Sequence, residues 1–146
     1  MGRPLSITAD AFERLCETAR QARPAEACGL LGGSRGESGD SVTSVTRVEN
    51  VADRPRTRYE LDSAKLLVGL EALAAAELEH VGFYHSHPRG PAGPSDIDRD
   101  RATWPGYSYC ILDLAGTDPL LGSWRWTGTT FEPQRVDIET GDAAAN

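Results

Sequence analysis

The sequence predicts an α/β protein, built as an α-β-α sandwich around a mixed, largely antiparallel sheet. Two segments repeat apolar residues at the three- and four-residue spacing of a helix, residues 9–22 and 63–79. Around them, short segments rich in Val, Thr and aromatic residues are typical of strands. Because turn residues separate several neighbouring strands, we expect hairpins, and therefore a mixed sheet rather than a doubly wound parallel one.

The first half of the chain is predicted to hold one helix and three strands. The helix covers residues 9–22, with Asp10 and Glu13 as a candidate capping pair and Pro24 after its end. The run 28–33 is apolar and contains three glycines, which indicates a buried strand with close backbone contacts. The other segments expected here are a hairpin loop and two strands, at residues 34–40, 42–48 and 58–61.

The second half begins with the clearest helical pattern. Five leucines give residues 63–79 a broad apolar face, and Asp62 or Ser63 can cap the first turn. His80 is interpreted as a cap at the end of this helix. A shorter helix is expected over 95–103, after a loop rich in Pro and Gly. The remaining strands are predicted at residues 81–86, 107–113, 120–126 and 130–136.

A length of 146 residues is close to that of one domain. We expect that domain over residues 1–136 and a small, polar, disordered tail over 137–146. The first residues lack the apolar core of a signal peptide. No apolar run approaches a length of about 20 residues, which a membrane span needs. Three cysteines without a CxxC pair argue against a disulfide scaffold, and Cys28 and Cys110 are interpreted as core residues. A cytoplasmic protein with reduced thiols is therefore expected.

The chain is acidic, with 22 Asp and Glu against 15 Lys and Arg and a formal net charge of −7. This balance argues against a nucleic acid or an anionic membrane surface as partner, because both attract basic proteins. Arg54, Arg56 and Arg58 nevertheless form a local positive run. The run is interpreted either as solvated surface or as an edge that binds a partner.

One segment carries residue types that are typical of a metal site. His85 and His87 are two residues apart at the end of a predicted strand, so both imidazoles point to the same side. Ser95 is placed to cap the next helix, with Asp98 one turn further on the same face. Two nitrogens and one carboxylate oxygen suit zinc, which keeps a fourth position for water in catalytic sites.

Less specific interpretations exist for each of these residues. A pair of histidines with this spacing also occurs as ordinary polar residues at a strand end, and Ser95 with Asp98 makes a helix-capping pair without any metal. The register of the histidines with Ser95 and Asp98 favours the metal site. A zinc-bound water also needs a base, and Glu26 is a candidate, although by itself it would be interpreted as a surface carboxylate.

The pattern His85-x-His87-Pro88-x6-Ser95-x2-Asp98, with Glu26 in an E-x-C-G-L-L-G context, resembles the JAMM (MPN-plus) metallopeptidase family. The likeness covers nearly the whole chain and includes further segments, at Asn50, residues 58–62 and residues 81–84. It implies the MPN/JAMM form of the sandwich, which is cytidine-deaminase-like in architecture. Every position of the motif matches the family pattern.

The resemblance also implies roles for the motif residues. His85, His87 and Asp98 would bind one Zn2+ per chain. Glu26 would take a proton from the zinc-bound water and return it to the leaving amine, and Ser95 would stabilise the oxyanion. The implied enzyme is a zinc metallo-isopeptidase, similar to archaeal members of the family. It would cut the bond after the C-terminal Gly-Gly of a ubiquitin-like protein attached to lysine, with the tail bound along a strand edge.

Two other functions fit the same motif. The resemblance extends to bacterial members that release cysteine or a C-terminal extension from sulfur-carrier proteins, which is the same chemistry with another leaving group. A non-catalytic module that binds ubiquitin-like tails is an alternative of a different class, although the complete motif favours an enzyme. A zinc nucleobase deaminase is excluded because the P-C-x-x-C half of its signature is missing.

Overall fold

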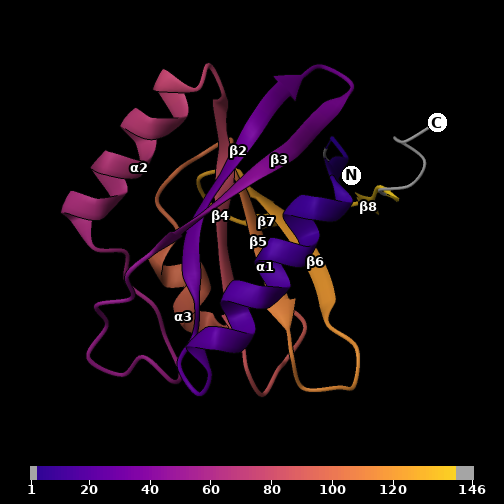
Figure 1. The fold of residues 1–146 in the computed structure, drawn as a ribbon. Coiled ribbons are helices and arrows are strands. Elements are labelled where there is room, and N and C mark those ends of the chain that lie inside the picture. Colours follow the sequence, from indigo (N-terminus) through magenta and orange to yellow (C-terminus); the bar gives the residue numbers. More distant parts are fainter. Residues whose placement is uncertain (1–2, 141–146) are drawn as a thin grey trace.

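A computed structural model describes residues 3–140 and arranges them in three layers (Figure 1). The middle layer is a sheet with the strand order β7-β6-β5-β4-β2-β3-β1-β8. Helix α1 packs against one face, and α2 packs against the other together with the residue that follows α3. Of the seven strand pairs in these residues, four are antiparallel and three parallel, so the predicted α-β-α sandwich with a mixed sheet is confirmed.

The elements follow the alternation of helices and strands that the sequence predicts. In chain order they are β1 (Leu5–Ile7), α1 (Ala9–Ala22), β2 (Cys28–Gly36), β3 (Gly39–Val48), α2 (Ser63–Ala75), β4 (Glu79–His87), α3 (Asp96–Arg101), β5 (Ser108–Asp113), β6 (Leu120–Trp126), β7 (Phe131–Gln134) and β8 (Val136–Ile138).

Two cores lie on opposite faces of the sheet because neighbouring strand residues point in opposite directions. On β4, Tyr84 packs with α1, whereas Phe83 packs with α2. Cys110 and Tyr109 divide in the same way on β5. The central strands β2, β4 and β5 are thus covered on both sides, and they hold the site described below in a rigid frame.

The first helix has the predicted bounds but a different cap. The side chain of Thr8 accepts a hydrogen bond from the N–H of Ala11 at 3.2 Å, so Thr8 is the N-cap and the predicted pair of Asp10 and Glu13 is wrong. Asp10 instead lies in the first turn, where its charge suits the positive end of the helix dipole. In α2 the cap is Asp62, one of the two residues expected.

The helix predicted over 63–79 ends earlier, at Ala75. The N–H of Glu77 donates to the carbonyl of Ala74, and that of Leu78 donates to the carbonyl of Leu73, which together terminate the helix. Glu77 adopts a positive φ of 60° to allow this. The chain then enters β4 at Glu79, so His80 lies in a strand and the predicted helix-capping role is wrong.

Several strand boundaries also differ from the predictions. The hairpin loop is shorter than the predicted residues 34–40, because β2 extends to Gly36 and β3 begins at Gly39. The strand predicted over 58–61 is wrong, since that segment makes one isolated bridge, between Leu61 and Asn50. The strand predicted over 130–136 is divided into β7 and β8. The three residues of β1 are too few for their pattern to be recognised.

The predicted start of a disordered tail at residue 137 is also wrong. Strand β8 includes Asp137 and Ile138, and the N–H of Glu139 donates to the carbonyl of Ile7. The last part of that predicted tail, residues 141–146, lies outside the described residues. Among the described helices, none is long and apolar enough to cross a membrane. Cys28 and Cys110 are buried, free thiols, as expected.

Candidate active site

Strands β2 and β4 bring Glu26 to the predicted histidines. The antiparallel register pairs Cys28 with His85, which places Ala27 beside Ser86. The Ser86 hydroxyl accepts a hydrogen bond from the N–H of Ala27 at 2.8 Å, and the N–H of Ser86 donates to the carbonyl of Ala27 at 3.0 Å. This register continues to Glu26 and His87, so a carboxylate 59 residues earlier in the sequence faces the His85–His87 pair.

Three polar atoms converge on one point between β4 and α3. Nε2 of His85 lies 3.2 Å from Nε2 of His87, and Oδ2 of Asp98 lies 3.1 Å from each of them. All three side chains are buried, with exposed fractions of 1%, 4% and 7% for the residues in chain order. The structure therefore brings together the three predicted ligand residues, which we call the donor cluster.

Neighbouring groups fix the orientation of the donor cluster. Nδ1 of His87 lies 2.8 Å from the carbonyl of Pro91, which leaves Nε2 as the unprotonated atom of that ring. Ser95 and Asp98 form a reciprocal capping box, in which the N–H of Ser95 donates to Oδ2 of Asp98 at 2.9 Å. The hydroxyl oxygen of Ser95 accepts from the N–H of Asp98 at 3.1 Å. Its own proton stays available for another acceptor.

The electrostatics of the donor cluster favour a carboxylate with two imidazoles. Burial alone would raise the pKa of Asp98, but its contacts with both histidines and with the Ser95 N–H hold it well below its usual range. Burial lowers the pKa of His85. Burial also opposes the charged form of His87, but contacts with Asp98 and Pro91 outweigh it and raise the pKa of that ring.

The donor cluster fits a tetrahedral metal ion. Zinc with ligands at about 2.0–2.1 Å holds its ligand atoms about 3.3 Å apart, and the three edges of the cluster are 3.1–3.2 Å. When Nδ1 of His87 donates to the carbonyl of Pro91, the neutral ring presents the lone pair of Nε2 to the cluster, as a metal ligand requires. The residues present are therefore compatible with a metal site.

Glu26 is a second carboxylate beside the two histidines. Its nearest oxygen and one ligand atom of each of His85 and His87 all lie within 4.8 Å of one another. Oε1 of Glu26 is buried without a hydrogen-bond partner among the described residues, and burial raises the pKa of Glu26 to about 8. Asp98 makes the closer contacts. Both carboxylates thus lie beside the two histidines, and only that of Asp98 is held by the backbone N–H of Ser95.

The loop between β3 and α2 holds Glu26 in place. The N–H of Glu26 donates to the carbonyl of Pro55 at 2.7 Å, and its own carbonyl accepts from Nδ2 of Asn50 at 3.0 Å. Nδ2 of Asn50 also donates to the carbonyl of Arg58 at 3.2 Å, and its Oδ1 accepts from the N–H of Glu60 at 3.0 Å. Asn50 thus joins this loop to the segment before β2 that carries Glu26.

Sequence reasoning missed the part that Tyr59 takes in the site. Its ring stacks on His85, with centroids 4.3 Å apart and an angle of 22° between the planes. The sequence indicates residues 58–62 only as a predicted strand and as part of a likeness to a family. No spacing relates Tyr59 to a histidine 26 residues away, so the contact becomes visible only in the folded chain.

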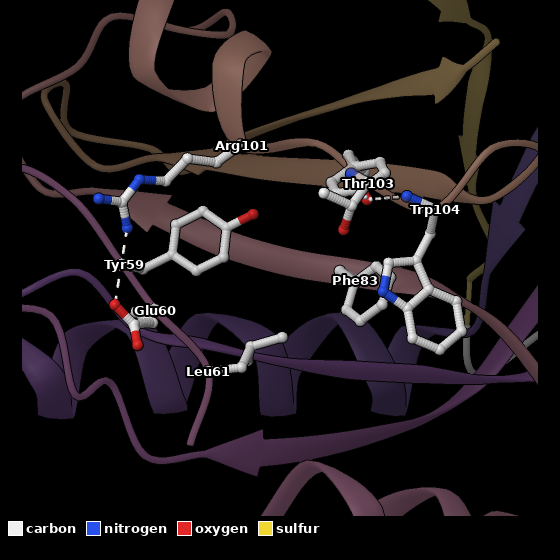
Figure 2. A pocket seen from close by; sticks show the side chains of 8 residues that line it. Tyr59, Glu60, Leu61, Phe83, Arg101, Thr103 and Trp104 are labelled. Carbon is white, nitrogen blue, oxygen red and sulfur yellow. Dashed lines mark hydrogen bonds and ion pairs between the residues drawn. The ribbon is translucent and has the colours of Figure 1, made fainter. Parts of the chain in front are cut away.

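A small pocket of about 150 Å³ adjoins the site at Tyr59 (Figure 2). One end is charged, where Arg101 pairs with Glu60 at 3.7 Å, and the other end is apolar, where Phe83 and Trp104 lie together. The other residues that line it are Leu61, Thr103 and Tyr109. The pocket therefore lies between Tyr59, which stacks on His85, and the segment that follows α3.

Comparison with known proteins gives one family match and several relatives. The model of prokaryotic homologues of the JAB domain matches residues 8–127. The chain is 41% identical over 139 residues to the Desampylase of Haloferax volcanii, which is 92% of this chain and 96% of that protein. It is 36% identical over 108 residues to the CysO-cysteine peptidase of Mycobacterium tuberculosis, 74% of this chain and 72% of the peptidase. The solution structure of protein DSY2949 from Desulfitobacterium hafniense matches with a TM-score of 0.86 and 30% identity, and covers 93% of each chain.

Proposed function

We propose that this chain is a zinc metallo-isopeptidase. The premise is that the chain belongs to the prokaryotic JAB-domain family and is a JAB-type hydrolase. Its substrate would be a ubiquitin-like protein whose C-terminal Gly-Gly is attached to lysine. The observation that carries this proposal is the buried donor cluster with Glu26 beside it. Residues 1–136, extended by the ordered part of β8, would form the single catalytic domain.

Each residue of the site has a proposed role that follows from its contacts. His85, His87 and Asp98 would hold Zn2+, which when bound supplies a water of low pKa and polarises the scissile carbonyl. Glu26 would accept a proton at Oε1, which has no competing partner, and return it to the leaving nitrogen. The free O–H of Ser95 would donate to the carbonyl oxygen as negative charge develops there.

The extent of the likeness supports release from lysine as the first choice. The match to the Desampylase spans 92% of this chain, whereas the match to the CysO-cysteine peptidase spans 74%. The second match is nevertheless specific enough to keep a second candidate, the release of cysteine from a sulfur-carrier protein. Both reactions need the same residues, and they differ only in the amine that leaves.

Intact-mass spectrometry of two substrates would test the proposal. One is a Gly-Gly-terminated ubiquitin-like protein joined to a lysine side chain, and the other is the same protein with a C-terminal cysteine. We expect chelator-sensitive release from lysine, and no release from lysine by the Glu26→Ala variant, although this variant keeps its zinc. Release from cysteine alone would move the function to sulfur-carrier processing. No cleavage by a protein that contains no zinc would favour the non-catalytic module.

A further inference from the structure

Three arginines line a cleft of about 390 Å³ at the rim of the proposed site. We call it the arginine cleft, and its lining consists of Arg23, Pro24, Arg56, Thr57, Pro88 and Arg89. The three arginines are exposed, and within residues 3–140 none of them forms an ion pair. A group of unpaired cations is unexpected on a chain with a formal net charge of −7.

The cleft is built from the segments that carry the proposed base and one proposed ligand. Pro24 is two residues before Glu26, and Pro88 directly follows His87. Arg56 follows Pro55, whose carbonyl accepts the hydrogen bond from the N–H of Glu26 at 2.7 Å. The lining of the cleft therefore adjoins the segments that carry the proposed reacting groups.

A tight turn places Arg89 at the rim. The N–H of Gly90 donates to the carbonyl of His87 at 3.1 Å, and Gly90 has a φ of +73°, which favours glycine. A Cβ at this position would lie 3.3 Å from Oδ1 of Asp113. The turn is therefore well defined, and Pro91, directly after it, contacts Nδ1 of His87 through its carbonyl.

The position of Glu26 indicates which part of the substrate meets the cleft. In the proposed reaction Glu26 returns a proton to the leaving nitrogen, so the leaving chain passes next to Glu26. The arginine cleft adjoins Glu26 in the chain at Pro24 and at Arg56, which follows Pro55. The pocket of Figure 2 begins instead at Tyr59, which stacks on His85. We therefore expect the arginine cleft to face the protein that carries the modified lysine, and the pocket to face the ubiquitin-like tail.

We propose that the arginine cleft binds carboxylates of the leaving protein, namely Asp or Glu residues that flank the modified lysine. This inference rests on the proposed isopeptidase function. The guanidinium group matches a carboxylate with two parallel hydrogen bonds, and here it has no partner to give up. Of the positive run at Arg54, Arg56 and Arg58, only Arg56 lines the cleft.

The test compares three peptides that differ only around one lysine, to which the Gly-Gly end of a ubiquitin-like protein is joined. The lysine is flanked by Glu, by Gln or by Lys. We expect kcat/KM to fall in that order, with a ratio of about tenfold between the first and the last, because two or three partly exposed ion pairs form or are replaced by repulsion. The ratio should approach one at about 1 M NaCl, where the Debye length is about 3 Å.

Charge reversal in the cleft provides the decisive variant. Arg56→Glu combined with Arg89→Glu should invert the order of the three peptides, compared within each enzyme. The matched control is Arg20→Glu combined with Arg54→Glu, which makes the same change in net charge at two exposed arginines that lie outside the cleft and form no ion pair within residues 3–140. We expect the control to keep the wild-type order.

The outcomes separate this inference from the proposed function. Equal rates on all three peptides, or an unchanged order in the cleft variant, would overturn the inference and leave the isopeptidase in place. No cleavage of the Gln-flanked peptide by the zinc-containing wild type would overturn the function and the inference with it. A cleft variant that loses only the release of a C-terminal cysteine would show that the cleft binds the α-carboxylate of a leaving amino acid, against the proposal.

Discussion

Strand β4 carries a histidine at its beginning and two at its end, and the two regions show what turns a buried histidine into a candidate ligand. His80 lies among aromatic rings, with centroids 4.8 Å from Phe83, 5.3 Å from Trp104 and 4.7 Å from Tyr107. Its Nε2 lies 3.0 Å from the carbonyl of Gly82. Burial lowers the pKa of His80, as it does for His85.

The difference lies in what surrounds each ring. His85 has a second imidazole and a carboxylate within 3.2 Å of its Nε2, whereas within residues 3–140 His80 forms no pair with a carboxylate. Burial and a lowered pKa are common to both, so neither identifies a metal site. A candidate metal site is identified instead by ligand atoms that converge on one point and have few other partners.

The largest effect is expected from the loss of one proposed ligand, which should remove the feature that distinguishes His85 from His80. Asp98→Ala removes the carboxylate from the donor cluster and leaves two imidazoles without their counter-charge. We expect zinc content, measured by elemental mass spectrometry, to fall to background, together with hydrolysis of the lysine-linked substrate. The control is His80→Phe, which should keep one zinc per chain. Full zinc occupancy in Asp98→Ala would contradict the ligand assignment.

Glu26→Gln should separate hydrolysis from metal binding. The amide is close in shape to the carboxylate but cannot take up a proton, so kcat should fall by about 10²- to 10⁴-fold. Because Glu26 is not assigned as a ligand, zinc content should stay at the wild-type value. A variant that loses zinc in parallel with activity would instead place Glu26 among the ligands.

Ser95→Ala should have an intermediate effect. Removal of one donor to the oxyanion is expected to lower kcat by about 10²- to 10³-fold. The same change removes the cap of α3 and should cost about 1 kcal/mol of stability, measured by denaturant unfolding. Ser95→Asp keeps a capping acceptor but has no donor, and it serves as the control. If Ser95→Asp recovers stability but not kcat, the two roles of the hydroxyl are distinct; recovery of both would refute the donor role.

The smallest effect is expected at His80, and it concerns stability alone. A histidine whose folded-state pKa is lowered contributes stability above its unfolded pKa, about 6.5, and loses it as the pH falls through that value. His80→Phe keeps an aromatic ring in the cluster without this titration. The melting temperature of the wild type should therefore fall relative to that of the variant between pH 7.5 and 5.5. A constant difference would contradict the lowered pKa.

The sequence predicts the donor cluster better than it predicts the rest of the site. His85, His87 and Asp98 lie within 14 residues, so strand and helix periodicity are sufficient to place them together. Glu26 and Tyr59 reach the same point through pairing and loop packing, which no local period encodes, and Glu26 was identified through a likeness to a family. The arginines of the cleft are dispersed over three segments, and only one of them belongs to the positive run in the sequence.

The fold shows the same division between local and distant information. The alternation of helices and strands was predictable because each long element has its own apolar period. The end of α2 was not, because it depends on the positive φ of Glu77, and aliphatic residues continue beyond that point. Strand β8 lies at the edge of the sheet and β1 lies next to it. Both depend on their parallel neighbours for stability, and their own three residues carry too little pattern.

The register between β2 and β4 has a consequence for the order of events during biosynthesis. The segment with Glu26 is synthesised first, and the candidate ligands follow 59 to 72 residues later (85 − 26 and 98 − 26). A single strand is not stable alone, so His85 and His87 have fixed positions only once β4 pairs with β2, through Ser86 and Ala27. The same pairing brings Glu26 to them. The proposed ligands and the proposed proton acceptor would therefore come together in one step, when the sheet forms.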